Sequence, residues 1–381
     1  MNILLYDMSS YIQADLIYYL KQAGHRCKNV IYHFTDPLQD DFFEWKFSQC
    51  LASDNWDCVI STNFFPLVAK TCYSHNLKYL SWSYDSPIDE RWYPYFQFPT
   101  SYVFLFDYMD ALKCNQLGFD RVYHLPLAVN TNRLDKILIT DTDKTRFTAD
   151  ISFVGQFYDS PLQNLMIGQS SYDKGYIDAI VQSQLNIYGT NFIDTMISDE
   201  LLERIDKVVY NSIHHHLTRW GLTNAITKQI AHIERITLCG ALGSEFDLKY
   251  YSASSPKELD SLKWNGTAYY FTEMPKIFKL STLNLCPILR CIQTGIPLRA
   301  LDVMGCKSTL FCNYQPEIAE NFENGVDVIM YESMEDAAEK AYYYLNNKEL
   351  CTKIASNGYA KVKAFYHYSD RIEKMFKAAD L

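Results

Sequence analysis

One stretch of the chain, residues 281–313, constrains the fold more than any other. It begins with an apolar run at 282–288 that has the length of a buried strand. A polar loop follows, then helical spacing at 298–304 that ends at Gly305, and a second apolar run at 309–312. Because parallel neighbouring strands need a crossover connection, this order predicts a strand–loop–helix–strand unit in a parallel sheet.

Charged residues lie in the loop and in the helix of this unit, where ligands of parallel sheets bind. Arg290 lies in the loop, Pro297 suits the first turn of the helix, and Arg299 and Asp302 are three residues apart on one helix face. Ligands bind at the carboxyl ends of parallel strands, and anions bind at helix N-termini. A guanidinium matches a phosphate, and a carboxylate accepts from ribose hydroxyls. On spacing alone, a helix-surface ion pair beside a buried core explains these residues equally well.

Strands alternate with helical segments throughout the N-terminal third. We expect strands at residues 2–6, 27–32, 57–61, 78–83, 102–106 and 121–125. This alternation predicts a parallel, Rossmann-like sheet that closes near Asn130. We interpret the polar stretch 131–149 as a connector. It contains Asp141-Thr142-Asp143, but a polar linker is a poor setting for a metal site, and we expect no metal there.

A second α/β region follows the connector. We expect strands at 150–155, 185–188 and 246–251, a short extended segment at 267–271, and a long helical region at 198–241. His214-His215-His216 lies inside that helical region, where three successive side chains point about 100° apart and cannot converge on one metal. We place His232 and Arg235 on the same helical region. For Arg235 we expect the surface, with a cleft as the alternative.

Composition excludes several classes of protein. The chain has 381 residues, enough for two domains, and its net charge of −10 opposes binding to a phosphate backbone. Its 11 cysteines lack CxxC pairs, as expected for reduced thiols in the cytoplasm. The start reads as a strand rather than a signal peptide, and no apolar run approaches a membrane helix in length. We therefore expect a cytoplasmic protein without a nucleic-acid partner or transmembrane segment, and leave a homodimer open.

The order of residues in the 281–313 stretch resembles bacterial CgeB-like glycosyltransferases (spore maturation protein type) of group 1. The family pattern is a strand ending in Asn, an Arg, and then Gly-Ile-Pro-x-Arg-x-x-Asp-x-Met-Gly. It is matched here by Asn284, Arg290, Gly295, Ile296, Pro297, Arg299, Asp302, Met304 and Gly305. Further similar segments lie at 81–87, 125–130, 151–158, 272–278 and 313–318.

This resemblance implies the GT-B fold, an α/β class in which two Rossmann-like domains face each other across a cleft. It divides the chain into an acceptor domain (1–130), a connector (131–149), a nucleotide-sugar domain (150–365) and a terminal helix (366–381). The terminal helix would cross back onto the first domain. GT-B enzymes use a nucleotide-diphosphate sugar as co-substrate, so we expect neither a bound metal nor another cofactor.

The resemblance also implies roles for individual residues. Arg290 and Arg299 would contact the diphosphate, with Arg299 stabilising charge in catalysis, and Asp302 would bind the ribose. The other expected donor-binding residues are Gly155, Phe157, Tyr158, Asn284, Gly295, Ile296 and Pro297.

On the acceptor side, Asp85 follows a strand and is the candidate general base. An Asx turn explains that position equally well. Ser9, Trp82 and Tyr84 are the other expected acceptor-binding residues. His124 is a second candidate base, although a core position is favoured for it.

Two departures from the related family 4 enzymes leave alternatives open. Thr294 stands where those enzymes carry an acid, and Gln156 stands where they carry an arginine. We expect a hexosyl-type glycosyltransferase acting on a glycan, protein or small-molecule acceptor. The alternatives are a non-catalytic glycan-binding or surface-assembly protein, and a nucleotide-sugar epimerase of the same fold.

Overall fold

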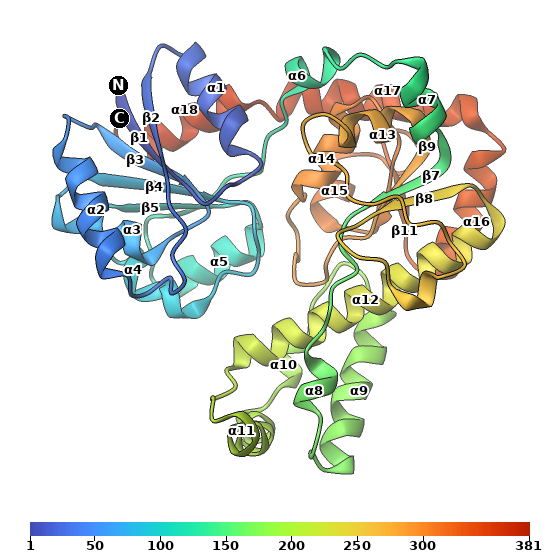
Figure 1. Cartoon of the computed structure of the whole chain (residues 1–381), viewed down its shortest axis with the longest axis horizontal. Helices are drawn as coiled ribbons and strands as arrows, with labels where there is room; N and C mark the ends of the chain where they lie inside the picture. The colour runs from blue at the N-terminus through green and yellow to red at the C-terminus, as the bar shows by residue number, and fades with distance from the viewer. The chain divides into compact units, whose positions relative to one another are not determined.

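The computed structural model describes residues 1–381 and contains two compact units, each built on a parallel sheet (Figure 1). Unit 1 comprises Met1–Asn130, Thr294–Leu301 and Val362–Leu381. Unit 2 comprises Thr131–Gln293 and Asp302–Lys361. No helix combines the length and the apolar character that a membrane span requires.

Unit 1 contains a six-stranded parallel sheet in the order β2-β1-β3-β4-β5-β6. Its strands are β1 (Asn2–Asp7), β2 (Arg26–Ile31), β3 (Cys58–Thr62), β4 (Lys78–Ser83), β5 (Ser101–Leu105) and β6 (Val122–His124). Its helices include α1 (Gln13–Gln22), α2 (Asp41–Ala52), α3 (Pro66–Ser74), α4 (Tyr93–Phe96) and α5 (Tyr108–Gln116). All six strands predicted for this region are confirmed. The inner strands β1, β3, β4 and β5 are buried on both faces and form continuous apolar runs, whereas the edge strand β2 is largely exposed.

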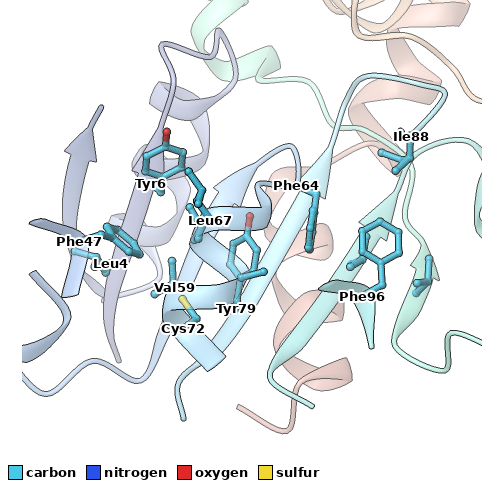
Figure 2. Packing of buried hydrophobic residues seen from close by; sticks show 14 of the residues in the cluster. Leu4, Tyr6, Phe47, Val59, Phe64, Leu67, Cys72, Tyr79, Ile88 and Phe96 are labelled. Carbon is cyan, nitrogen blue, oxygen red and sulfur yellow. The ribbon is translucent and has the colours of Figure 1, made fainter. Parts of the chain in front are cut away.

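Aromatic side chains fill the core of unit 1. Tyr6, Phe47, Phe64 and Tyr79 pack together with aliphatic residues of β1, β3 and α3 (Figure 2). Tyr6 donates from its hydroxyl to the carbonyl of Tyr32 (2.8 Å), and the hydroxyl of Tyr79 lies 2.6 Å from that of Ser61. Such partners let tyrosine be buried. Part of the high tyrosine content therefore serves the core rather than a ligand.

The C-terminal helix α18 (Tyr368–Ala378) belongs to unit 1. Arg371 donates from Nε to the carbonyl of Pro126 (2.8 Å), and the Tyr368 ring stacks on that of Tyr19 at 5.3 Å. The amide of Val129 donates to the carbonyl of Tyr366 (3.0 Å). These contacts join the two ends of the chain in one packed unit.

Unit 2 contains a five-stranded parallel sheet in the order β11-β10-β9-β7-β8. Its strands are β7 (Ala149–Val154), β8 (Leu248–Tyr251), β9 (Ser281–Cys286), β10 (Leu310–Asn313) and β11 (Ile329–Tyr331). Its later helices are α13 (Met274–Leu280), α15 (Pro316–Asn321) and α16 (Met334–Leu345), whereas α14 (Leu298–Gly305) and α17 (Lys348–Phe365) each contain residues of both units. The strand–loop–helix–strand unit predicted for residues 281–313 is thus present as β9, α14 and β10.

Between β7 and β8 the chain forms a helical insertion with its own apolar core (Figure 1). It consists of α8 (Leu162–Leu165), α9 (Ser171–Leu185), α10 (Ile193–Met196), α11 (Asp199–Ile213) and α12 (Arg219–Glu245). The strand predicted at 185–188 is wrong, because α9 continues to Leu185 and no strand follows. The extended segment predicted at 267–271 is also not a strand.

The histidine run does not lie inside a helix, as the sequence had suggested. His214 has a left-handed backbone (φ 53°) and ends α11, and a break of several residues precedes α12. His216 instead lies 2.8 Å from the carboxylate of Asp206. The apolar periodicity continues across the break, which is why sequence reasoning joined the two helices.

The predicted polar connector is partly helical, with α6 (Thr131–Asp135) and α7 (Asp141–Phe147). Asp143 forms a capping box with Thr140 and an ion pair with Lys276 (2.9 Å). These hydrogen bonds lower the pKa of Asp143 to about 2. The Asp-x-Asp sequence here therefore starts a helix.

Candidate functional site

The parallel strands of unit 2 bring their following loops to one edge of the sheet. Three of these loops matter here, at residues 155–160, 252–258 and 287–293. Helix α12 passes this edge, and its side chains bond to the backbone of the loops. This edge is where a ligand site is expected, and most of the predicted donor residues lie near it in sequence.

Arg235 on α12 ties two of these loops together. Its guanidinium donates to the carbonyls of Gln156 and of Pro287 (2.8 Å to the latter) and lies 4.8 Å from the centre of the Tyr158 ring. The residue is buried, so the surface position expected for it is wrong. Backbone carbonyls at the ends of β7 and β9 need donors, and Arg235 supplies them.

Arg290 is also buried, in an ion pair with Glu234 of α12. The pair is 3.0 Å long and both side chains are only 2% exposed. The Arg290 guanidinium lies 4.0 Å from the centre of the Tyr188 ring. Burial disfavours the charged guanidinium, but Glu234 outweighs this effect and raises the pKa of Arg290. Breaking this pair would cost several kcal/mol, and the Arg290 Nε is buried without a hydrogen-bond partner.

Two further polar residues expected at the donor lie inside unit 2. Asp302 is 1% exposed and accepts a hydrogen bond from the hydroxyl of Tyr270 (3.1 Å). Asn284 is equally buried. Its side-chain oxygen accepts from the hydroxyl of Ser152 (2.8 Å), and its amide donates to two backbone carbonyls. In this arrangement both residues have structural partners, with Asn284 joining β9 to β7.

The loop after β7 also uses its polar groups internally. The Gly155 amide donates to the Tyr251 carbonyl (3.0 Å), which continues the pairing with β8. Phe157 is buried against the rings of Phe153 (5.0 Å) and Tyr250 (5.6 Å). Of the three residues predicted here, Phe157 and Tyr158 line a cavity, and the backbone of Tyr158 is left-handed (φ 56°).

The segment Thr294–Leu301, which carries several predicted donor residues, packs with unit 1. Thr294 donates from its hydroxyl to the Asp107 carboxylate (2.7 Å) at the start of α5. A Cβ on Gly295 would lie 2.6 Å from the Phe106 ring and 2.8 Å from the Phe106 carbonyl, so only glycine fits. Ile296 is buried, while Pro297 and Arg299 are half-buried. Arg299 therefore sits on a different structural unit from Arg290.

Asp85 follows β4 in unit 1 and keeps an exposed surface. Its carboxylate accepts from the side-chain amide of Asn63 (2.7 Å), and the Asn63 side-chain oxygen accepts from the Tyr84 backbone amide (2.9 Å). Surrounding protein raises the pKa of Asp85 by desolvation, and the Asn63 hydrogen bond opposes this shift. The Asx-turn alternative is wrong, since the carboxylate bonds Asn63 and not the following backbone.

Of the other predicted acceptor residues, only Tyr84 lies next to Asp85. Trp82 is fully buried and donates to the Leu125 carbonyl (3.2 Å), so it belongs to the core. Ser9 has a left-handed backbone (φ 65°) and bonds His33 (3.1 Å). Tyr84 is half-buried next to Asp85.

Sequence reasoning missed a buried carboxyl beside this loop. Ser86 donates from its hydroxyl to Asp110 on α5 (2.6 Å). Burial, with a further contribution from the charge of Asp107, raises the pKa of Asp110 to about 7. The only feature of the sequence that could have indicated this carboxyl was the short spacing of Asp107 and Asp110 at the start of a helix.

Sequence reasoning also missed a cavity of about 450 Å³ in unit 2. It lies between the loops after β7 and β8 and one face of α12, and we call it the α12 pocket. Residues from all three elements line it, including Gln156, Tyr158, Gln229, His232, Ser254 and Glu258. His232 donates from Nδ1 to the Phe157 carbonyl (3.0 Å), and its Nε2 lies 3.7 Å from Glu258.

Comparisons with known proteins add to this geometry. Residues 219–377 match the model of a family described as glycosyl transferase-like, from the start of α12 into α18. No curated protein matches this chain in sequence.

Solved structures resemble the chain over its whole length. HepE of Anabaena, solved in complex with UDP-glucose, has a TM-score of 0.54 and 12% identity, covering 100% of this chain and 99% of that one. A glycosyltransferase from Rickettsia africae has a TM-score of 0.55 and 11% identity, covering 99% and 98%. Sucrose-phosphate synthase from Thermosynechococcus elongatus has a TM-score of 0.54 and 11% identity, covering 100% and 98%.

At these identities the likeness shows the fold, and it confirms the predicted GT-B class with two parallel-sheet α/β domains. The family match covers the larger part of the second domain's sheet and α12. Together the two findings support a glycosyltransferase of the GT-B fold.

Proposed function

We propose that this protein transfers a hexose from a nucleotide-diphosphate sugar to a hydroxyl-bearing acceptor. The match of residues 219–377 to a glycosyl transferase-like family, in a chain with the GT-B fold, carries this proposal. Unit 2 would bind the nucleotide sugar at the carboxyl edge of its sheet, as expected for such sheets. HepE, of the same fold, has been solved with UDP-glucose, which makes uridine nucleotides the first ones to test.

The residue pattern from Asn284 to Gly305 supports the narrower proposal of a CgeB-like enzyme. Within that pattern we propose Arg299 as the cation that contacts the diphosphate. It lies at the start of α14, where the helix dipole also favours an anion. Because Arg290 and Asp302 have buried partners, we propose that they hold the shape of unit 2.

The chemistry requires one proton transfer and one bond cleavage. The acceptor oxygen forms a bond to the anomeric carbon while the bond from that carbon to the diphosphate breaks. The acceptor proton goes to a base, for which we propose Asp85. Arg299 would stabilise the negative charge that builds on the leaving diphosphate, without a metal ion or a further cofactor.

The test is release of nucleoside diphosphate from UDP-, GDP- and dTDP-hexoses, with and without EDTA. We expect release with one of these donors, unchanged by EDTA, and at least a tenfold loss of kcat/KM in Arg299→Ala. Arg204→Ala is the matched control, because Arg204 forms a half-exposed pair with Asp173 on the helical insertion.

Three outcomes would contradict the proposal. Binding of a nucleotide sugar without turnover would indicate a non-catalytic protein. Conversion of the sugar without release of nucleotide would indicate an epimerase. Failure of every nucleoside diphosphate to raise the melting temperature at millimolar concentration would remove the nucleotide site altogether.

A further inference from the structure

The α12 pocket has the size of a small-molecule site and lies wholly within unit 2. Its volume of about 450 Å³ falls within the range of about 300–1,000 Å³ typical of ligand pockets. The residues that line it come from three separate stretches: the loop after β7, α12 and the loop after β8. The site is therefore made by the tertiary fold and not by one local motif.

Most polar groups in the pocket have no partner in the protein. The side-chain amides of Gln156, Gln163 and Gln229 and the hydroxyl of Tyr158 line the pocket and make no hydrogen bond within the chain. An amide offers both donors and an acceptor on one planar group. Groups of this kind match the vicinal hydroxyls of a sugar, which also donate and accept.

The charge of the pocket disfavours a phosphate. Its lining includes the carboxylates of Asp159 and Glu258, and it contains no lysine or arginine. The nearest arginine, Arg235, donates to backbone carbonyls instead. A phosphoryl group would meet two negative charges and no fixed cation other than a protonated His232, so an uncharged ligand is favoured.

His232 is oriented for a hydroxyl ligand. Because Nδ1 carries the proton that bonds the Phe157 carbonyl, the neutral ring presents Nε2 as an acceptor. Glu258 is 3.7 Å from Nε2, which is too far for a direct hydrogen bond. Both acceptors are therefore available to ligand hydroxyls that donate to them.

Tyr158 adds a second observation at the same place. Its φ of 56° is a left-handed conformation that L-residues rarely adopt. This backbone places the tyrosine ring at the pocket, with the Arg235 guanidinium 4.8 Å from the ring centre. Strain of this kind persists where the surrounding structure requires a side chain to be placed.

We propose that the α12 pocket binds a neutral carbohydrate ring, separately from the diphosphate contact assigned to Arg299. The inference goes beyond the proposed reaction, because it concerns binding of an uncharged sugar and requires no turnover. Gln229 and His232, one helix turn apart on α12, and Glu258 from the opposite loop would bond its hydroxyls.

The test uses saturation-transfer difference NMR on the full chain with glucose, galactose, N-acetylglucosamine and maltotriose as probes. We expect at least one of them to bind, and glucose 6-phosphate to bind at least tenfold more weakly than glucose. Gln229→Ala and His232→Ala should each weaken sugar binding about tenfold. Gln182→Ala, an exposed glutamine on α9, is the control and should change nothing.

Four results would overturn the proposal. The first is that no probe gives a signal at 20 mM, and the second is that wild type and both pocket variants bind the sugar equally well. The third is that glucose 6-phosphate binds more tightly than glucose, and the fourth is that UDP alone displaces the sugar. Circular dichroism and melting temperature identify a variant that fails to fold. If a pocket variant fails to fold, Glu258→Gln is tested in its place, because this change leaves the interior of unit 2 untouched. It should weaken sugar binding severalfold.

Discussion

Asp110 offers the sharpest quantitative test of unit 1. Its carboxyl is 9% exposed, accepts from the Ser86 hydroxyl and lies near Asp107. Burial and the Asp107 charge raise its pKa from 3.8 to about 7. A difference of about three pKa units corresponds to about 4 kcal/mol between the two protonation states. The perturbation is Asp110→Asn, which has the same shape and can still accept from Ser86 but cannot ionise.

The sign follows from proton binding in the two states. The folded protein holds the Asp110 proton more tightly than the unfolded chain does. The stabilisation from this proton is fully present below pH about 4, falls progressively as the pH rises, and is lost above about 7. Asp110→Asn does not suffer this loss. We expect the variant to be more stable than wild type by about 4 kcal/mol at pH 8.5 and by about 1–2 kcal/mol at pH 5, and equal to it only near pH 4.

The assay is denaturant unfolding of both proteins at pH 5, 6, 7 and 8.5, followed by tryptophan fluorescence. Asp178→Asn, at an exposed position on α9, serves as the control. A stability difference that stays constant across this pH range would refute the reasoning. So would a variant that is less stable than wild type at pH 8.5, because Asp110 would then be ionised and stabilised in the folded protein.

The remaining predictions concern the other features of the two units. Arg290→Ala should destabilise by about 3–5 kcal/mol in denaturant unfolding, because Glu234 is left buried and unpaired. Gly175→Ala on α9 should raise stability by about 1 kcal/mol, since a Cβ there meets nothing within 4 Å. Gly358→Ala on α17 should instead lower it by about 1–3 kcal/mol, since its Cβ would lie 2.5 Å from a backbone carbonyl. Asp85→Asn should reduce kcat about 10²-fold or more and remove the fall in rate at low pH, because only the ionised carboxylate accepts a proton.

Each of these predictions has a result that contradicts it. If Arg290→Ala had little effect on stability but greatly weakened nucleotide binding, Arg290 would be a ligand-binding residue. Equal effects of the two glycine substitutions would show that the close approach at Gly358 is relieved by movement. An Asp85→Asn enzyme with the wild-type pH–rate profile would exclude Asp85 as the base.

The sequence by itself determined the fold class. All six strands of unit 1 and the β9–α14–β10 unit were predicted. For the inner strands the reason is that burial on both faces leaves continuous apolar runs, while the exposed edge strand β2 was predicted from its place in the alternation of strands and helices. Sequence reasoning failed where two patterns look alike locally. The break at His214 interrupts a helical periodicity that continues on both sides, and the end of α9 resembles a short strand.

Only the tertiary structure decided what the polar residues do. From the sequence, Arg290 is a cation in a loop. The structure shows that it is buried in an ion pair with Glu234, which lies 56 residues earlier in the chain. From the sequence, Asp302 is an acid on the surface of a helix. The structure shows that it accepts a hydrogen bond from the Tyr270 hydroxyl. The α12 pocket joins Tyr158, His232 and Glu258 from three distant stretches. Folding brings together distant parts of the chain, and these parts supply the ion-pair partner of a charged residue and the residues that line a pocket with it. No local sequence pattern carries that information.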